Sequence, residues 1–262
     1  MILDDIVEKK KVRLEVAKEE KPFETVRREA EEAIRQGEGG EEFPFYKALK
    51  KPGLSLIGEY KKASPSLGNI PQNMKVEERI ADYNRSVDAI SCLTEEDYFH
   101  GSVPIFQEVR ALTPLPMLRK DFMIDEYQFY EAKSIGANAI LLIAAILDPV
   151  QMKDFYQLAT ELGLDALAEA HSEGQVEQAL NAGCRIIGVN NRDLRDFTIR
   201  LDTTKRLRPL VPKDKCFVTE SGIVKEEDVA YLKKCGIDAC LVGRALMETK
   251  DPAALAEKWK AM

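Results

Sequence analysis

From residue 54 onward the chain alternates between short apolar segments and longer amphipathic ones, and this repetition constrains the fold more than any other feature. The short segments are rich in β-branched residues, which favours strands, and segments of helical length such as 149–162 and 172–182 separate them. The predicted strands are residues 54–60, 87–93, 116–119, 139–143, 165–170, 185–190, 216–219 and 239–242. Parallel strands need a crossover between them, so this alternation predicts an α/β fold with a parallel sheet.

Eight strand–helix units fit into the residues from 55 to 262, at roughly 26 residues each, which predicts a closed (β/α)₈ TIM barrel. An open, doubly wound sheet is the structural alternative. We expect residues 1–262 to form a single barrel domain, of which 1–50 are an N-terminal helical extension. Its first helix has an apolar face at Ile2, Leu3, Ile6 and Val7, and its second covers about 22–36 and ends at Gly37 and Gly39–Gly40. The lysine run at 9–11 is expected to be a solvated helix face.

Composition excludes several function classes. With 38 basic and 45 acidic side chains, the net charge of −7 argues against a nucleic-acid binder. The longest apolar run, 139–147, is far shorter than the roughly 20 residues that cross a membrane. Asp4 and Asp5 stand where a secretory signal would carry bases, so we expect a cytoplasmic protein that contacts no membrane.

Cofactor signatures are absent from the sequence. The five cysteines form no C-x-x-C pair and lie in apolar stretches, as buried free thiols do. With only His100 and His171 beside them, no metal site is expected. Neither a G-x-G-x-x-G motif nor a P-loop occurs, so no organic cofactor is expected either.

Polar residues gather where five of the predicted strands end. They are Glu59, Tyr60 and Lys61; Arg119, Lys120 and Asp121; Glu169; Asn190, Asn191 and Arg192; and Glu220. Isolated charges at strand ends can serve solubility alone. Because catalytic groups of TIM barrels come from the C-terminal ends of the strands, five such ends predict one shared pocket.

The last two strands predict a phosphate site. Ser221-Gly222 follows the seventh strand and Gly243-Arg244 follows the eighth, where barrels frequently bind phosphate. Glycine lets the backbone approach the anion closely, and N–H groups at a helix start can bind it. Both glycines could instead serve turns alone.

The remaining pocket residues predict proton-transfer chemistry. A lysine that is partly desolvated beside other cations is expected to have a lowered pKa and to act as a general acid, while a glutamate in the same cavity accepts protons. No serine or cysteine nucleophile stands beside a histidine. The expected substrate is phosphorylated and bears a carbonyl group.

Several segments together resemble the indole-3-glycerol phosphate synthases. They are residues 56–66, with the pattern L-I-G-E-Y-K-K-A-S-P-S; 118–122, L-R-K-D-F, followed by Asp125, Tyr127 and Gln128; 90–95; 188–194; and 220–223. They follow in the order of that family, and the resemblance extends over essentially the whole chain, the helical extension included.

The resemblance implies a carboxy-lyase of tryptophan biosynthesis. Its substrate, 1-(2-carboxyphenylamino)-1-deoxyribulose 5-phosphate, closes to indole-3-glycerol phosphate with loss of carbon dioxide and water. Lys120 would be the general acid for ring closure, Glu169 and Lys61 would carry the later proton transfers, and Glu59 and Glu220 would orient the lysines and the sugar hydroxyls. The implied substrate-binding residues are Asn190 and Arg192 for polar groups, Ser64 for the anthranilate carboxylate, and Ser221, Gly222, Gly243 and Arg244 for the phosphate.

The resemblance implies no metal and no organic cofactor, and we expect a monomer whose partner is its small-molecule substrate. It also implies that the extension lies over the C-terminal rim of the barrel, where Phe45 and Tyr46 are expected to reach the aromatic ring of the substrate. The alternative is that the extension only covers the exterior of the barrel. Two other functions stay open. A phosphoribosylanthranilate isomerase is expected to carry a cysteine at the first strand end, where this chain has Glu59 and Lys61. A phosphate-sensing barrel without activity should have lost Lys61, Lys120 or Glu169 while keeping Ser221-Gly222.

Overall fold

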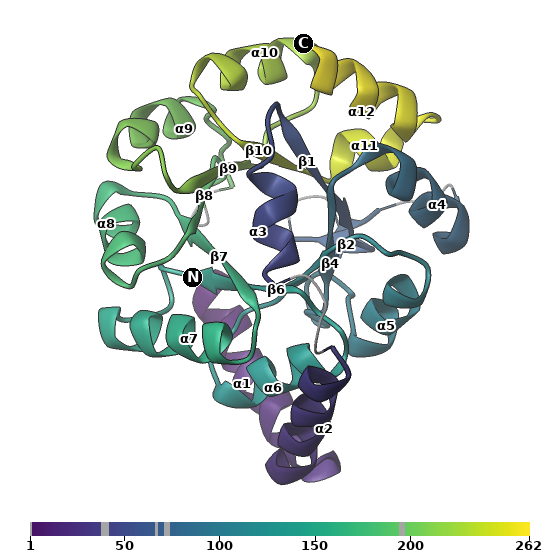
Figure 1. Cartoon of the computed structure of the whole chain (residues 1–262), viewed down its shortest axis with the longest axis vertical. Helices are drawn as coiled ribbons and strands as arrows, with labels where there is room; N and C mark the ends of the chain where they lie inside the picture. Colours follow the sequence, from purple (N-terminus) through teal and green to yellow (C-terminus); the bar gives the residue numbers. More distant parts are fainter. Residues whose placement is uncertain (1, 38–41, 66–67, 71–73, 194–196) are drawn as a thin grey trace.

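Eight strands form a closed parallel barrel in the computed structural model, which describes residues 2–37, 42–65, 68–70, 74–193 and 197–262 (Figure 1). The barrel strands are β1 Ser55–Tyr60, β4 Ala89–Leu93, β5 Met117–Lys120, β6 Ala139–Ile143, β7 Asp165–Ala170, β8 Ile186–Asn190, β9 Cys216–Glu220 and β10 Ala239–Val242. Their order around the barrel is β1-β10-β9-β8-β7-β6-β5-β4, and β4 pairs with β1 to close it. The predicted TIM barrel is confirmed, and each predicted strand agrees with an observed one to within two residues at either end.

Helices surround the barrel and precede it. They are α1 Ile2–Glu20, α2 Phe23–Gln36, α3 Pro44–Leu49, α4 Val76–Ser86, α5 Val103–Ala111, α6 Glu126–Ser134, α7 Pro149–Glu161, α8 Glu173–Asn181, α9 Asp202–Leu207, α10 Glu226–Lys234, α11 Arg244–Glu248 and α12 Pro252–Ala261, with a 3-10 turn at Arg208–Leu210. Side-chain caps set several of their starts: in α7, Asp148 accepts the N–H of Gln151 and the Gln151 side chain accepts the N–H of Asp148. A short hairpin, β2 Ala63–Ser64 with β3 Gly68–Asn69, follows β1 and was not predicted.

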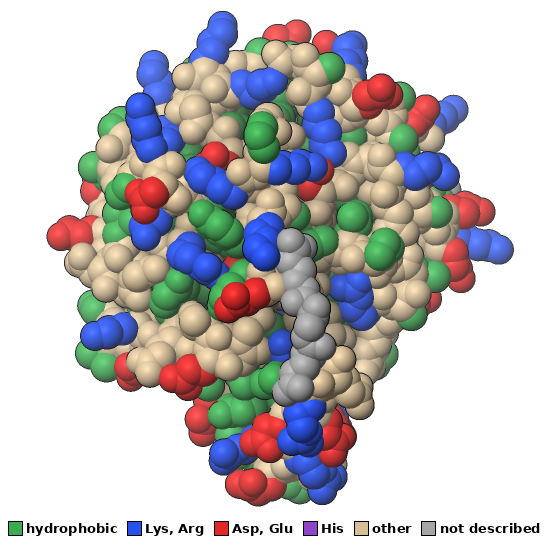
Figure 2. Space-filling view, viewed as in Figure 1, with side chains coloured by type: hydrophobic (Ala, Val, Ile, Leu, Met, Phe, Trp, Pro, Cys, Tyr) green, Lys and Arg blue, Asp and Glu red, His purple; other side chains and the backbone are tan. Residues whose placement is uncertain are grey.

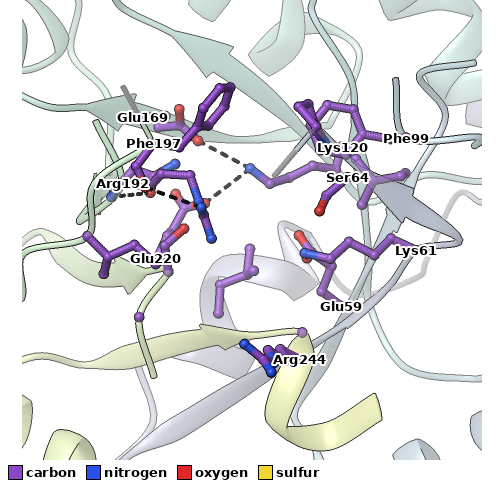
Figure 3. Close-up of a pocket in the computed structure, with 18 of the residues that line it drawn as sticks. Glu59, Lys61, Ser64, Phe99, Lys120, Glu169, Arg192, Phe197, Glu220 and Arg244 are labelled. Atoms are coloured by element: carbon purple, nitrogen blue, oxygen red, sulfur yellow. Dashed lines mark hydrogen bonds and ion pairs between the residues drawn. The ribbon is translucent and has the colours of Figure 1, made fainter. Parts of the chain in front are cut away.

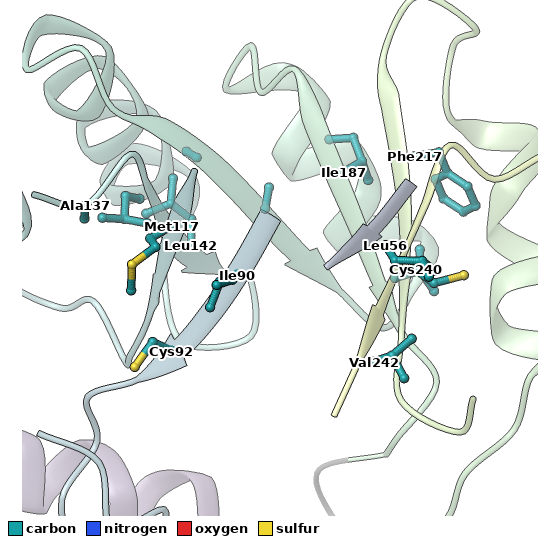
Figure 4. Close-up of a cluster of buried hydrophobic side chains, with 14 of the residues drawn as sticks. Leu56, Ile90, Cys92, Met117, Ala137, Leu142, Ile187, Phe217, Cys240 and Val242 are labelled. Atoms are coloured by element: carbon teal, nitrogen blue, oxygen red, sulfur yellow. The ribbon is translucent and has the colours of Figure 1, made fainter. Parts of the chain in front are cut away.

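The strands separate two apolar layers because their side chains alternate between two faces. Leu56, Ile90, Met117 and Phe217 point outward and pack under the surrounding helices, as Figure 4 shows for part of this layer. The inward layer fills the barrel with Ile57, Ala89, Leu118, Leu141, Ile143, Leu167, Ile186, Val218 and Leu241. Inward positions near the C-terminal ends of the strands are polar instead, and they form the site described below.

Helix α3 closes the N-terminal end of the barrel. Phe45 and Leu49 are fully buried in the inward layer, and α3 occupies the centre of the ring of strands (Figure 1). The N–H of Tyr46 donates to Asp165, the first residue of β7, at 2.9 Å, and Lys50 donates to the carbonyl of Lys215 just before β9 at 2.8 Å. The prediction that Phe45 and Tyr46 reach the substrate was therefore wrong, because the carboxyl ends of the strands lie at the opposite end of the barrel.

The first two helices lie outside the ring of strands, beside α6 (Figure 1). Helix α2 packs on α6, and its start and its end at Gly37 agree with the prediction, whereas Gly39–Gly40 lie outside the described residues. Tyr127 of α6 donates to the carbonyls of Ala17 and Lys21 and so holds the junction of α1 and α2.

Lys10 is buried, which corrects the prediction that the lysine run at residues 9–11 is a solvated helix face. It is 4% exposed, and its Nζ lies 2.9 Å from Asp121 and 3.0 Å from Glu96. Lys11, the next residue, is more than half exposed and forms an ion pair with Glu8 of the preceding turn. The repeat of α1 turns Lys10 toward the barrel and Lys11 away from it.

The surface and the cysteines agree with the composition. Figure 2 shows basic and acidic side chains interspersed over the face that it presents. Four of the five cysteines are buried free thiols and Cys235 is partly buried. Within the described ranges, every helix is too short or too polar to cross a membrane.

Candidate active site

A cavity of about 370 Å³ opens at the C-terminal end of the barrel. It is lined by the twelve residues for which the sequence predicted a catalytic or substrate-binding role at the strand ends: Glu59, Lys61, Ser64, Lys120, Glu169, Asn190, Arg192, Glu220, Ser221, Gly222, Gly243 and Arg244. Phe45 and Tyr46 are not among its lining residues. These side chains come from β1, β5, β7, β8 and β9 and from the segments after β1, β8, β9 and β10. Residues far apart in sequence therefore share one pocket, as the strand-end argument predicts.

Lys120 lies between two carboxylates. Its Nζ is 3.2 Å from Oε2 of Glu169 and 3.1 Å from Oε2 of Glu220, and Figure 3 shows the lysine extending between them. The Lys120 side chain is 13% exposed and the two glutamates are almost fully buried. The ammonium group is thus held at the cavity wall by the charge-assisted hydrogen bonds that it donates to glutamates of β7 and β9.

Lys61 and Glu59 form a second pair on a neighbouring wall (Figure 3). Nζ of Lys61 donates to Oε1 of Glu59, and both side chains are largely buried. The two residues lie on the same face of β1 and its extension because they are two positions apart. Two ammonium groups and three carboxylates therefore face one small space.

The carboxylates raise the pKa of Lys120 and overturn the predicted direction of its shift. Burial alone would lower this pKa, but the charges of Glu220, Glu169 and Glu59 outweigh burial. From the sequence we expected neighbouring cations to lower the pKa of Lys120. Instead, the nearest neighbours are anions, so Lys120 is protonated at neutral pH and has a proton to donate.

The three glutamates differ in their affinity for a proton. Burial raises the pKa of Glu220 to about 7, and the neighbouring Glu169 adds to this while Lys120 opposes it. Burial likewise opposes the charge on Glu169 and Glu59, but Lys120 and His171 hold the pKa of Glu169 below its usual range, and Lys61 does the same for Glu59. Glu220 is therefore the carboxyl group poised to exchange a proton near neutral pH.

Two turns bring backbone to the cavity at the predicted phosphate site. Ser221 and Gly222 follow β9 with φ of 65° and 80°, a conformation that favours glycine at 222. Gly243 is the residue before α11, and Arg244 is its first residue. Nε of Arg244 donates to Glu248 at 2.8 Å and its side chain is 54% exposed, so this interaction runs along α11. The backbone of residues 243–244 therefore fits the predicted phosphate-binding role better than the guanidinium group of Arg244 does.

Polar groups at two further positions face the cavity. Oδ1 of Asn190 accepts the N–H of Arg192 at 3.0 Å, and the Asn190 side chain also helps to lower the pKa of Glu169. Burial lowers the pKa of Arg192, whose Nη1 reaches the carbonyl of Phe197 at 3.5 Å. Oγ of Ser64 is buried and has no hydrogen-bond partner within the described residues. Such a hydroxyl is available to a bound molecule.

Apolar walls complete the cavity, and most of their residues were not predicted from the sequence. Phe99, Phe122, Phe197 and Ile199 line it, together with Ile2, Leu3 and Ile6 of α1. The predicted position of the N-terminal extension at this rim agrees with the contribution of α1. Phe99 and Phe197 lie in loops after β4 and β8, so their place at the C-terminal end of the barrel was the signal that could have found them.

His171 was also missed as a neighbour of the site. Its Nε2 lies 3.7 Å from Oε1 of Glu169 and has no hydrogen-bond partner in the described structure. The position two residues after Glu169, directly beyond the end of β7, was the available signal.

Not every polar strand end points into the cavity. Tyr60, Arg119, Asp121 and Asn191 are absent from its lining. Arg119 instead donates to Gln128 of α6 at 3.1 Å, and Asn191 hydrogen-bonds to Thr204 and Thr219. Each of these residues neighbours a cavity residue in sequence, so the two-residue period of the strand turns it to the opposite face.

Comparisons with solved structures show the fold alone. A 3-hexulose-6-phosphate synthase from Salmonella typhimurium matches with a TM-score of 0.63 at 15% identity, covering 79% of this chain and 97% of that one. A thiamine phosphate pyrophosphorylase from Pyrococcus furiosus matches with a TM-score of 0.60 at 16% identity, covering 79% and 94%.

Comparisons of sequence show the family. The family model described as indole-3-glycerol phosphate synthase matches residues 3–258. Curated proteins of that name are 48% identical in Lachnospira eligens, covering 99% of this chain and 97% of the relative, and 46% identical in Endomicrobium trichonymphae, covering 95% of each. A third, from Thermoanaerobacter pseudethanolicus, is 44% identical and covers 96% and 94%. The chain belongs to the indole-3-glycerol phosphate synthase family.

Proposed function

We propose that the chain closes 1-(2-carboxyphenylamino)-1-deoxyribulose 5-phosphate to indole-3-glycerol phosphate, with release of carbon dioxide and water. The observation that carries the proposal is the ammonium group of Lys120, which two buried glutamates hold at the wall of a partly apolar cavity. Membership of the family supports the reaction class.

Lys120 is the general acid of the first step. As the ring carbon that bears the carboxylate attacks the carbonyl carbon, a new carbon–carbon bond forms and negative charge develops on the carbonyl oxygen. Nζ of Lys120 donates its proton to that oxygen. Loss of carbon dioxide from the same ring carbon then restores the aromatic electrons. The raised pKa of Lys120 keeps the proton in place until the carbonyl oxygen needs it.

Glu169 and Lys61 serve the dehydration that follows. One group must protonate the departing hydroxyl, and another must accept a proton from the ring carbon between the nitrogen and the hydroxyl-bearing carbon as the indole double bond forms, while the ring nitrogen keeps its hydrogen. Glu169 keeps its charge at neutral pH and suits the base, while Lys61, which pairs with Glu59 at the cavity wall, suits the acid. Glu59 and Glu220 orient the two lysines and contact the sugar hydroxyls.

The binding residues divide the substrate among them. The buried, unpartnered hydroxyl of Ser64 suits the anthranilate carboxylate, and Phe99 and Phe122 suit its ring. Asn190 and Arg192 hold polar groups of the chain. The backbone at Ser221, Gly222, Gly243 and Arg244 suits the phosphate. We further propose that the protein acts as a cytoplasmic monomer, forms one domain and uses no metal or organic cofactor.

The test is direct incubation of the purified protein with 1-(2-carboxyphenylamino)-1-deoxyribulose 5-phosphate while indole fluorescence is recorded. Fluorescence should rise, and carbon dioxide should be released in equal amount. Turnover of phosphoribosylanthranilate with no reaction of the deoxyribulose phosphate would favour the isomerase alternative. Binding of phosphorylated compounds without turnover of either would favour a sensing barrel.

Lys120→Ala is the matched variant for this assay. General acid catalysis is typically worth about 10²–10⁴-fold, so kcat should fall by at least that much while the circular dichroism stays near that of the parent. A folded variant whose kcat lies within about threefold of the parent would remove Lys120 from the proposed role.

A further inference from the structure

Gly188 lies inside the barrel between the strands of the two glutamates that hold Lys120. Its register partner on β7 is Glu169, and Asn190, two residues later, is the partner of Glu220 on β9. Because side chains alternate along a strand, Gly188 faces the same interior as Asn190. A side chain at position 188 would therefore project toward the group around Lys120.

The carboxylate of Glu220 occupies the space that a side chain at 188 would need. A Cβ atom added to Gly188 would lie 2.5 Å from Oε1 of Glu220 and 3.0 Å from Cδ1 of Leu167. The first distance is shorter than real Cβ contacts allow, so one atom must move. Oε1 is the far end of a flexible side chain that borders the cavity, so the carboxylate is the group expected to move.

Backbone geometry does not require a glycine at this position. Gly188 lies within β8 and is not among the glycines with positive φ. A glycine in a strand interior loses packing and costs roughly 0.5–1 kcal/mol relative to alanine. Such a residue marks a place where another group approaches the strand closely. Here that group is the carboxylate of Glu220, whose other oxygen lies 3.1 Å from Lys120.

Gly243 repeats the same arrangement on the other lysine–glutamate pair. A Cβ atom there would lie 2.6 Å from Oε1 of Glu59 and 3.2 Å from Nζ of Lys61. Two of the lysine–glutamate contacts of the cavity, Lys120–Glu220 and Lys61–Glu59, thus each lie against a glycine of a neighbouring strand or strand end.

We propose that Gly188 is a positioning residue, which holds the carboxylate of Glu220 against Lys120 by leaving its space open. The inference rests on the proposed function, in which Lys120 is the general acid. A group displaced by about 1 Å can cost about 100-fold in rate. Gly188→Ala is therefore expected to lower kcat by about that factor with a smaller change in KM, because the defect lies at the reacting atoms.

The experiment pairs Gly188→Ala with Glu220→Asp. Aspartate is one methylene shorter, which withdraws the carboxylate by about the 1.5 Å of a carbon–carbon bond and makes room for the added methyl group. The four proteins of the cycle are the parent, the two single variants and the double variant. The loss of kcat caused by Gly188→Ala should be about 100-fold in the parent and less than about threefold in the Glu220→Asp background. An equal loss in both backgrounds would overturn the proposal.

Gly174→Ala is the control for a glycine replacement as such. It lies in α8, and a Cβ atom added there meets nothing within 4 Å, so kcat should stay at the parent value. If Gly188→Ala does not fold, comparing it with the double variant that also carries Glu220→Asp still tests the proposal. Folding restored by Glu220→Asp supports the proposal, and a double variant that also fails to fold contradicts it.

A crystal structure of Gly188→Ala gives a readout that needs no activity. The distance from Oε2 of Glu220 to Nζ of Lys120 should exceed 4 Å, against 3.1 Å in the parent. An unchanged distance would overturn the inference about Gly188 whatever the reaction. If the carboxylate is displaced but the parent protein does not turn over the deoxyribulose phosphate, the inference that Gly188 positions Glu220 stands and the proposed function is rejected.

Discussion

Among the three glutamates of the cavity, Glu220 is the one whose pKa is raised close to neutral pH. Its carboxyl group is buried with Glu169 and Glu59 nearby, and both factors favour the neutral form. Only Lys120 favours the charged form strongly, so the pKa of Glu220 rises to about 7. Above this pH the carboxylate orients Lys120, and below it the carboxyl group is neutral and holds the lysine less firmly.

The pH profile of kcat/KM tests this assignment, because it reports ionisations of the free protein. As pH falls through about 7, Glu220 takes up a proton and kcat/KM should decrease. In Glu220→Gln the side chain is neutral at every pH, so the decrease of kcat/KM near pH 7 should vanish and kcat/KM should be low at every pH. The substrate phosphate titrates near pH 6, and its limb should remain in both proteins. A limb near pH 7 that persists in Glu220→Gln would assign it to another group.

At the residue scale, the sequence predicts which side chains reach the cavity better than it predicts their charge state. Lys120 and Glu169 follow from strand ends and the two-residue period. The direction in which the pKa of Lys120 shifts does not follow from the sequence, because it depends on which charged groups lie within about 4 Å. One of them, Glu220, is 100 residues away in the sequence. The same period explains why Arg119 and Asp121, on either side of Lys120, face helices rather than substrate.

Helix α1 is the element that joins the N-terminal segment to the catalytic end of the barrel. Its first residues, Ile2 and Leu3, line the cavity. Farther along, Lys10 is buried against Asp121, which immediately follows Lys120. Asp121 also accepts from Thr94 at 2.6 Å, so one carboxylate links α1, the end of β4 and the end of β5.

Lys10→Ala should destabilise the fold by about 3–5 kcal/mol, because it leaves the Asp121 carboxylate buried with one cation fewer. The Asp121 side chain is fully buried and that of Lys10 is 5% exposed. The pair formed by Lys11 with Glu8 is exposed, so Lys11→Ala should change stability by less than about 1 kcal/mol. Urea denaturation of both variants measures the difference, and equal losses would show that the Lys10 contact contributes little.

At the element scale, the repeated strand–helix pattern of the sequence made the barrel predictable. Helix α3 lies outside that repeat and was not predicted. Each β/α unit repeats an apolar strand and an amphipathic helix, so the pattern carries its own evidence. The six residues Pro44–Leu49 are too short for a helical period to emerge, and their burial depends on the barrel that closes around them. The two strands of the β2–β3 hairpin are shorter still, with two residues each.

The whole molecule separates packing from chemistry along the barrel axis. Phe45 and Leu49 fill the N-terminal end, whereas the charged groups gather at the C-terminal end. This division is general in such barrels, where conserved function resides at the C-terminal face. It predicts that stability and activity respond to changes at different ends.

Phe45→Ala provides the test at this scale. Removing a fully buried phenyl ring should cost about 3–5 kcal/mol of unfolding free energy. At a temperature where the variant is folded, its kcat and KM should remain within about twofold of the parent, since the ring lies at the end opposite the cavity. Denaturation and steady-state assays measure the two quantities. A large change in KM would mean that packing at the N-terminal end reaches the substrate.

Closure of one end by α3 also makes the active cavity a dead end. Within the described residues, substrate, carbon dioxide, water and indole product are therefore expected to enter and leave at the C-terminal end of the barrel, where Ile2, Leu3 and Phe197 line the cavity. The product retains the phosphate and the ring, so it occupies the place that the next substrate needs. Indole-3-glycerol phosphate should therefore inhibit competitively, raising the apparent KM without lowering kcat. A noncompetitive pattern in initial rates would require a second route, and in this barrel the ring of Phe45 stands where that route would run.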